Sequence, residues 1–301
     1  MNWQKLIFDF FTYGILIYSS LLLFFYIFIG IFSSVEIRKY LRRNSYADLR
    51  VLAASEHLPG ISVIAPAYNE AANIIENVRS MLSIHYNLLE LIIVNDGSKD
   101  ATLKQLIEAY DLYKTNTFIH EQIPTKKVRG VYKSNNPVYN KLVVVDKENG
   151  GKADALHVGV NIAKYGCFVC VDVDCVLEQD ALLKMIKPFL EETKVRVIAS
   201  GGVIRIANNC KIENGRLIEI NLPKKFLARV QTIEYIRAFL LGRMAWSRLN
   251  GLLLISGAFG AFDKEIVIKC GGYNVNTVGE DMELIVRMRR YMEENKIPYR
   301  V

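Results

Sequence analysis

An unbroken apolar segment near the N-terminus constrains the folding of this 301-residue chain more than any other feature. Residues Phe10–Val35 carry no charged side chain. At about 1.5 Å per residue, a helix of this length exceeds the roughly 30 Å hydrocarbon core of a bilayer. The segment is too long for the core of a signal peptide and lacks a small-residue cleavage site. It therefore predicts a retained transmembrane anchor.

The charges that follow this segment predict its orientation. Before it, Lys5 is balanced by Asp9, whereas the basic residues after it are Arg38, Lys39, Arg42 and Arg43. Because Lys and Arg collect on the cytoplasmic side, we expect a single-pass anchor in the cell membrane with the rest of the chain in the cytoplasm. Residues 36–59 are charged and predict a cytoplasmic linker. A net charge of +7 suits an anionic membrane surface or substrate, and no nucleic-acid-binding motif is present.

The region after the linker alternates between strand and helix patterns. Ile61–Ala65 is a short apolar strand that Pro66 is expected to stop, and helical spacing follows over Ala71–Ile84. Leu89–Val94 repeats the strand pattern, and Ala101–Tyr110 repeats the helix pattern. This alternation predicts an α/β fold with a mostly parallel sheet and covering helices. In such sheets, ligands bind beyond the carboxyl ends of the strands.

Two aspartates stand at the expected end of another buried strand. The apolar run Phe168–Val173 predicts the strand, and Asp172 and Asp174 are one residue apart. In extended backbone such residues point to the same side, so the two carboxylates would face one point. Mg²⁺ or Mn²⁺ would offset their repulsion, since both ions prefer hard oxygen ligands. The alternative is a polar strand end with two solvated aspartates, because short motifs often match by chance.

Further polar segments fall where loops meet helices. Asn149–Lys152 opens a helix with two glycines and a lysine, which resembles an anion-binding helix start but lacks the Walker A spacing. Glu280 and Asp281 precede the helix Met282–Glu294, where they could cap the helix or supply a general base. Ser256–Phe262 is small and aromatic and predicts a loop that a flat ring can approach.

The remaining segments have less distinctive patterns. Basic, turn-rich Glu121–Asn140 predicts a loop at the edge of the site or an ordinary solvated loop. Phe226–Asn250 has helical spacing with interleaved arginines, so it would lie on the membrane surface or pack on the sheet. Asn214–Gly215 has hairpin-turn chemistry. The other predicted strands are Leu142–Val145, Val195–Ile206 and Arg216–Ile220.

Taken together, these motifs carry a family resemblance. Six of them occur in order: Tyr68–Glu70, Asn95–Ser98, Gly151–Ala153, Asp172–Asp174, Ser256–Gly260 and Gly279–Asp281. This order resembles the family-2 glycosyltransferases, and within them the processive membrane synthases of poly-N-acetylglucosamine, hyaluronan, chitin and cellulose. The resemblance covers about residues 60–296. It implies a GT-A (Rossmann-like) domain over residues 60–301 and inverting transfer from a UDP-sugar donor to a hydroxyl of a saccharide acceptor.

The resemblance also implies roles for individual residues. Asp281 would be the catalytic base with Glu280 beside it, and Asp174 would ligate Mg²⁺ or Mn²⁺. Ser256 and Gly257 would line the acceptor pocket. The full substrate-binding set would comprise Pro66, Tyr68, Glu70, Asp96, Lys152, Asp172, Ser256 and Gly257. Within this set, Tyr68, Glu70 and Asp96 would hold the uridine, and Lys152 would neighbour the ribose or phosphates.

One departure from the family pattern leaves alternatives open. The processive members carry a Q-x-x-R-W motif after the acidic pair, followed by further membrane helices, and this chain ends at Val301 before that motif. We therefore expect a C-terminally truncated form or a different branch. One helix cannot form a closed channel, so a partner membrane subunit would be needed for translocation. A non-catalytic UDP-sugar-binding remnant is a second hypothesis. Another nucleotide-using transferase or a dehydrogenase is a third, although no G-x-G-x-x-G follows Ile61–Ala65.

Overall fold

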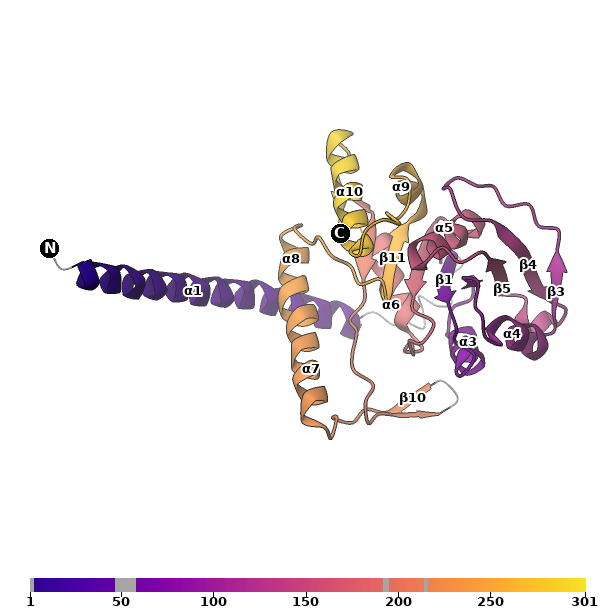
Figure 1. The fold of residues 1–301 in the computed structure, drawn as a ribbon, viewed down its shortest axis with the longest axis horizontal. Helices are drawn as coiled ribbons and strands as arrows, with labels where there is room; N and C mark the ends of the chain where they lie inside the picture. The colour runs from indigo at the N-terminus through magenta and orange to yellow at the C-terminus, as the bar shows by residue number, and fades with distance from the viewer. Residues whose placement is uncertain (1–2, 47–57, 192–194, 214–215) are drawn as a thin grey trace.

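A computed structural model describes residues 3–46, 58–191, 195–213 and 216–301. The long helix α1 (Trp3–Tyr46) extends away from an α/β domain (Figure 1). It is long and apolar enough to cross a membrane, with a mean hydropathy of 2.5 in its most apolar window, and that window is not buried. The helix continues to Tyr46, so the first part of the predicted linker is helical, while residues 47–57 lie outside the described part.

An eight-stranded sheet forms the centre of the domain, in the order β3-β4-β5-β2-β1-β6-β11-β8. Its four middle strands run parallel, as the alternating pattern predicts. These are β5 (Leu142–Lys147), β2 (Leu89–Asn95), β1 (Ile61–Ala67) and β6 (Cys167–Val171). Antiparallel strands complete both edges. They are β3 (Leu112–Thr115), β4 (Val128–Ser134), β8 (Ala199–Gly201) and β11 (Phe259–Asp263).

Helices bury both faces of this sheet. Alternate residues of β1 divide between two cores, with Val63 and Ala65 in one and Ile64 in the other. Such double burial explains why the middle strands are nearly continuous apolar runs. The first core includes helices α3 (Ile74–Leu82), α4 (Thr102–Tyr110) and α6 (Ala181–Glu191). The second includes α5 (Lys152–Ile162), α9 (Lys264–Lys269) and α10 (Glu280–Glu294).

Strand β1 does not stop before Pro66, contrary to the prediction from sequence. It continues to Ala67 and remains in register with β2, where Pro66 lies opposite Val94. On its other side, β1 pairs with β6 only from Ile61 to Ile64. Proline lacks a backbone N–H and is excluded from positions that must donate to a ladder on both sides. The early end of the β6 pairing therefore permits Pro66 in a central strand.

Two segments predicted as loops contain strands. Strand β4 lies within Glu121–Asn140, where it pairs with β3 and β5. Strand β11 begins within Ser256–Phe262, continues to Asp263 and pairs antiparallel with β6. Arg129 and Lys133 interrupt the apolar pattern of β4, and the small residues Gly260 and Ala261 weaken the strand pattern of β11. Phe168 and Phe262 stack across β6 and β11 with ring centroids 5.5 Å apart.

The segment predicted as the strand Val195–Ile206 divides into two short strands. Strand β7 (Arg196–Val197) pairs with β12 (Tyr299–Arg300), and β8 pairs with β11. Strand β10 (Arg216–Glu219) is found as predicted but pairs with β9 (Lys211–Glu213), which the prediction missed. The predicted turn at Asn214–Gly215 lies outside the described residues.

A helical rod crosses the C-terminal part of α1 (Figure 1). It consists of α7 (Phe226–Ile236), the π-helix Arg237–Arg243 and α8 (Met244–Arg248). The hydroxyl of Ser33 donates to the Leu240 carbonyl, and the Arg248 guanidinium lies 3.2 Å from Glu36. The helix expected over Phe226–Asn250 is therefore present, but it packs against α1 and not on the sheet.

Candidate active site

The carboxyl ends of β1, β2 and β6 border one polar cavity of about 320 Å³. The strand ends deliver polar loops to the same edge of the sheet, as expected for a parallel sheet. Most of the substrate-binding residues inferred from sequence line this cavity, together with the expected metal ligand. The lining residues are Pro66, Ala67, Tyr68, Glu70, Asp96, Lys152, Asp172, Val173 and Asp174.

Hydrogen bonds join the loops that follow β1 and β2 into one unit. The amide of Asn69 donates to the Ser98 hydroxyl at 3.0 Å, and Asn69 accepts from the amide of Lys99 at 2.8 Å. The amide of Glu70 donates to the Thr102 hydroxyl at 2.9 Å. Gly97, immediately before Ser98, has φ 66°, a left-handed conformation that favours glycine. Tyr68 is left 45% exposed beside the cavity.

Asp96 is buried at the inner end of this unit and accepts hydrogen bonds at both carboxylate oxygens. The donors are Lys147 Nζ at 2.6 Å, Gly150 N at 2.9 Å, Gly151 N at 2.8 Å and Asn149 Nδ2 at 3.1 Å. The glycine-rich segment before α5 thus binds an anion, as its pattern predicts, but that anion is a carboxylate of the chain itself. The partners Lys147 and Asn149 were missed from the sequence. A lysine ending the otherwise apolar run of β5 was the available signal.

Lys152 extends from the start of α5 toward the end of β6. Its ammonium group forms a hydrogen-bonded ion pair with Asp172. Burial alone would lower the pKa of Lys152, but the hydrogen bond to Asp172 and the charges of Asp172 and Asp281 raise it above the usual value. Lys152 therefore remains a cation at neutral pH, at the edge of the cavity.

The Asp172–Asp174 segment is a turn and not the extended backbone expected from sequence. The strand ends at Val171, and the amide of Cys175 donates to the Asp172 carbonyl at 2.9 Å. Asp172 is engaged by Lys152, whereas Asp174 acts electrostatically on Glu70. Burial, Asp174 and Asp100 together raise the pKa of Glu70. The two aspartates therefore line one cavity but have different partners.

This arrangement fits a divalent cation that is shared with a bound substrate. Within the described ranges, no three His, Cys, Asp or Glu side chains are grouped as a complete metal site. Mg²⁺ usually takes only one or two protein carboxylates, and substrate phosphates and waters supply its other ligands. The Asp174 carboxylate offers a hard oxygen in the cavity, and a cation there would relieve its repulsion of Glu70.

Asp281 lies in the first turn of α10, next to this cavity. One carboxylate oxygen, Oδ2, accepts a hydrogen bond from the Gly257 amide at 2.8 Å. The other, Oδ1, is buried and has no hydrogen-bond partner among the residues that the structure describes. Burial raises the pKa of Asp281, with further contributions from Glu280 and Asp172, against the opposing effects of the Gly257 amide and Lys152. Raised pKa values of this origin are typical of general bases.

The pairing of β11 with β6 brings the Asp281 group beside the cavity. The Asp172 amide donates to the Ala258 carbonyl at 3.3 Å, next to the Gly257 amide that holds Asp281. The predicted site residues thus form two adjoining groups. Ser256, Gly257, Glu280 and Asp281 are outside the cavity lining and make up the second group.

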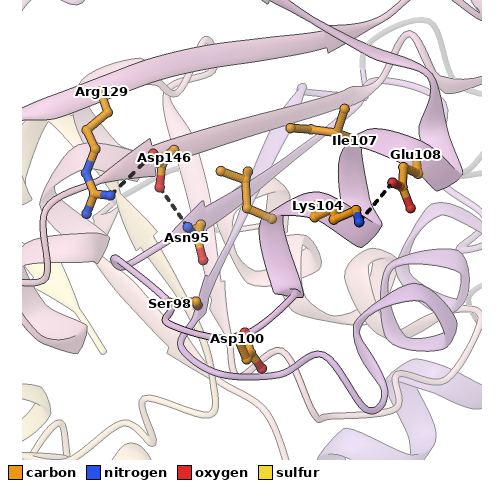
Figure 2. A pocket seen from close by; sticks show the side chains of 9 residues that line it. Asn95, Ser98, Asp100, Lys104, Ile107, Glu108, Arg129 and Asp146 are labelled. Carbon is orange, nitrogen blue, oxygen red and sulfur yellow. Dashed lines mark hydrogen bonds and ion pairs between the residues drawn. The ribbon is translucent and has the colours of Figure 1, made fainter.

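A second cavity, of about 370 Å³, lies beside α4 (Figure 2). None of the predicted site residues lines it. Its polar groups pair with one another: Asn95 donates to Asp146 at 2.7 Å, and Arg129 lies 3.8 Å from the same carboxylate (Figure 2). Lys104 and Glu108 form an exposed pair at 3.8 Å. These internal pairings make the second cavity a less suitable donor site than the first.

The mixed α/β fold, with its mostly parallel central sheet, matches glycosyltransferases of the GT-A type. The mannosyltransferase PcManGT from Pyrobaculum calidifontis, solved in complex with GDP-Man and Mn²⁺, superposes with a TM-score of 0.54. The superposition covers 91% of this chain and 66% of that chain at 16% sequence identity. A likeness at this level of identity shows the fold alone.

Residues 62–250 match the family model described as glycosyl transferase family 2, and the chain belongs to this family. It is 29% identical over 293 residues to the poly-beta-1,6-N-acetyl-D-glucosamine synthase of Staphylococcus aureus (strain COL). It is 28% identical over 281 residues to the synthase of the same name from Staphylococcus epidermidis. The alignments cover 94% and 92% of this chain, and the chain spans 58% of the length of each relative. The alternative of a dehydrogenase is thereby overturned.

We predict that Gly257→Ala abolishes most transferase activity without unfolding the protein. A Cβ atom at position 257 would overlap the Asp281 carboxylate, so the carboxylate must move away from the Gly257 amide. Misplacement by about 1 Å at a reacting centre costs on the order of 100-fold in rate. Rate measurements on purified protein test this expectation. The control is Gly166→Ala, whose Cβ meets nothing within 4 Å; equal activity of the two variants would contradict the placement of Asp281.

Proposed function

We propose that the chain is a membrane-anchored, inverting glycosyltransferase that moves a sugar from a UDP-sugar to a hydroxyl of a saccharide acceptor in polysaccharide synthesis. The observation that carries this proposal is one cavity that gathers Tyr68, Asp96, Lys152 and Asp172 directly beside Asp281. The names of the staphylococcal relatives support a saccharide acceptor and an amino-sugar donor.

The cavity provides separate surfaces for the parts of the donor. In this proposal, Tyr68, Glu70 and Asp96 hold the uridine, with Pro66 beside them; the exposed ring of Tyr68 supports this role, and the internally bonded Asp96 would border the base. Lys152 is a cation at a helix N-terminus, where the helix dipole also favours a diphosphate. The ion pair with Asp172 already orients the Lys152 ammonium group. An incoming diphosphate would contact the same ammonium group.

A divalent cation, Mg²⁺ or Mn²⁺, is proposed as the cofactor, with Asp174 as its protein ligand. When bound, it would supply positive charge that stabilises the leaving diphosphate. Lys152 would act on the same charge from its side of the cavity. The Mn²⁺ in the PcManGT complex supports a divalent ion without deciding between the two metals.

Asp281 is proposed as the base that accepts the proton of the acceptor hydroxyl. In an inverting transfer, that oxygen bonds to the anomeric carbon while the bond from that carbon to the diphosphate oxygen breaks. Oδ1 of Asp281, which has no hydrogen-bond partner among the described residues, would take the proton once the acceptor reaches it, and the Gly257 amide holds Oδ2. Ser256 and Gly257 would then border the acceptor, with Glu280 beside the base. The raised pKa strengthens Asp281 as a proton acceptor.

The membrane placement rests on α1 and on the rod that crosses it. We propose residues 1–35 as the anchor segment, residues 36–59 as a cytoplasmic linker and residues 60–301 as the cytoplasmic catalytic domain. Ser33, which bonds the rod, belongs to the uncharged part of α1, so the rod would lie at the depth of the membrane interface. Its exposed apolar side chains fit that position. They include Phe226, Leu227, Ile233 and Ile236.

A panel of UDP-sugars and GDP-mannose, read by mass spectrometry with Mg²⁺, Mn²⁺ or EDTA, tests the proposed function. We expect a glycosylated product and free UDP from at least one UDP-sugar, and loss of both with EDTA. Metal-dependent UDP binding without turnover would instead indicate a non-catalytic sugar-nucleotide-binding subunit. Turnover that is independent of metal, or of uridine, would contradict the proposed donor chemistry.

We predict that Asp281→Asn lowers the rate of transfer by at least about 100-fold while the affinity for UDP stays nearly unchanged. Asparagine can still accept the Gly257 hydrogen bond but cannot take a proton. In the wild-type enzyme, the rate should rise with pH through the pKa of Asp281, above the ordinary aspartate value of about 3.9. The pH dependence of kcat/KM, together with UDP titrations of both proteins, measures these effects. Parallel losses of affinity and rate would rule out the role of base.

Tryptophan fluorescence tests the membrane placement. The natural tryptophans Trp3 and Trp246 are replaced by Phe, and one tryptophan is introduced at position 226 or at position 118. Both positions hold exposed phenylalanines, 82% exposed at Phe226 and 88% at Phe118. In nanodiscs, brominated lipids should quench the tryptophan fluorescence of the Phe226→Trp variant and leave that of the Phe118→Trp variant unchanged. Similar quenching at the two positions would contradict contact between the rod and the membrane.

A further inference from the structure

A wholly buried lysine adjoins the donor cavity without lining it. Lys147 is the last residue of β5, and its Nζ lies 2.6 Å from Asp96 Oδ1 and 2.6 Å from Asp154 Oδ2. It also donates to the Glu148 carbonyl at 2.5 Å. An ammonium group has three protons to donate, so the available donors of Lys147 are used within the protein. This leaves Lys147 no evident capacity to bind a substrate directly.

The buried ion cluster connects three elements of the site. Asp96 follows β2 and lines the cavity, whereas Asp154 lies in the first turn of α5, two residues after Lys152. Asp154 also accepts from the Lys126 amide at 3.1 Å. Lys147 therefore bridges the carboxylate on the nucleobase side of the cavity and the helix that presents Lys152 to the phosphate side.

Removing this cation would change the state of Asp96 more than that of any other lining residue. Without Lys147, two buried carboxylates, Asp96 and Asp154, would lie close together with no cation between them. A buried charge that loses its partner is strongly unfavourable, so Asp96 would rotate, take up a proton or admit water. The remaining donors from Asn149, Gly150 and Gly151 are on the loop that precedes α5, and they hold Asp96 only from that side.

We propose that Lys147 is a positioning residue for donor recognition, which holds Asp96 at a fixed distance from Lys152 before the nucleotide binds. The inference rests on the proposed donor site and extends it. The nucleobase side of the cavity, bordered by Asp96, and the phosphate side, at Lys152, are then parts of one preorganised unit. Preorganisation increases affinity because fewer groups must be ordered on binding. A role restricted to folding stability predicts a different result, which the following experiment separates.

The test compares Lys147→Met with Lys141→Met in the full chain in nanodiscs. Lys141 immediately precedes the same strand, but its Nζ donates to the Tyr86 carbonyl at 3.2 Å, away from the cavity. Calorimetry with Mn²⁺ measures the affinities for UDP, GDP and pyrophosphate. Hydrogen bonds to charged groups contribute about 1.5–3 kcal/mol, so Lys147→Met should weaken UDP binding about 10- to 100-fold. The preference for UDP over GDP should fall with it, whereas pyrophosphate affinity and all affinities of Lys141→Met should change little.

Each outcome separates the positioning role from the proposed donor. A lower melting temperature of Lys147→Met with an unchanged UDP-to-GDP ratio would overturn the positioning role. A wild-type protein with no preference for UDP would overturn the proposed donor itself. If Lys147→Met does not fold, Asn149→Ala replaces it, since Asn149 is exposed and donates to the same carboxylate. Asn149→Ala should also lower the preference for UDP over GDP, and an unchanged ratio of the two affinities would contradict the inference.

Discussion

Burial of the central parallel strands on both faces is the constraint from which the rest of this structure follows. Strands β1, β2, β5 and β6 pack into a core on each side, so their interior positions are almost entirely apolar. Polar groups are therefore displaced to the strand ends, where Asp96, Lys147 and Asp172 occur. Because the strands are parallel, their carboxyl ends share one edge, and residues far apart in sequence become neighbours. The cavity is a direct consequence of how the sheet is buried.

The same constraint explains which parts of the fold could be predicted from sequence. Continuous apolar runs predicted the four parallel strands, and the loops after three of them supplied most of the cavity lining. Strand β4 was missed because Arg129, Gly130 and Lys133 interrupt its apolar residues, and its extended form depends on pairing with β3 and β5. Strand β11 was missed because Gly260 and Ala261 have little strand propensity, and pairing with β6 and β8 makes this segment extended.

The electrostatic connections of the site were less predictable than its position. The short motifs indicated Asp96, Asp172 and Asp281, but not that Asp96 would be enclosed by Lys147 and the amides before α5. A lysine at a strand end is most often solvated, so its complete burial depends on two carboxylates that arrive from other elements. Likewise, the unpartnered oxygen of Asp281 depends on the approach of Gly257 to α10, which no local pattern encodes.

The antiparallel pairing of β11 with β6 has a consequence for how enzymes of this architecture diversify. Asp172 follows β6 and Ala258 precedes β11, so the register of this ladder sets the distance between Asp172 and the Gly257 amide that holds Asp281. A shift of that ladder by one residue would exchange the two buried faces of β11 between the two cores, and only a two-residue step of about 7 Å would restore them. The distance between Asp172 and the Gly257–Asp281 pair can therefore change through the ladder only in steps of two residues. Smaller changes at this site must come from its side chains or from the loop that leads into β11.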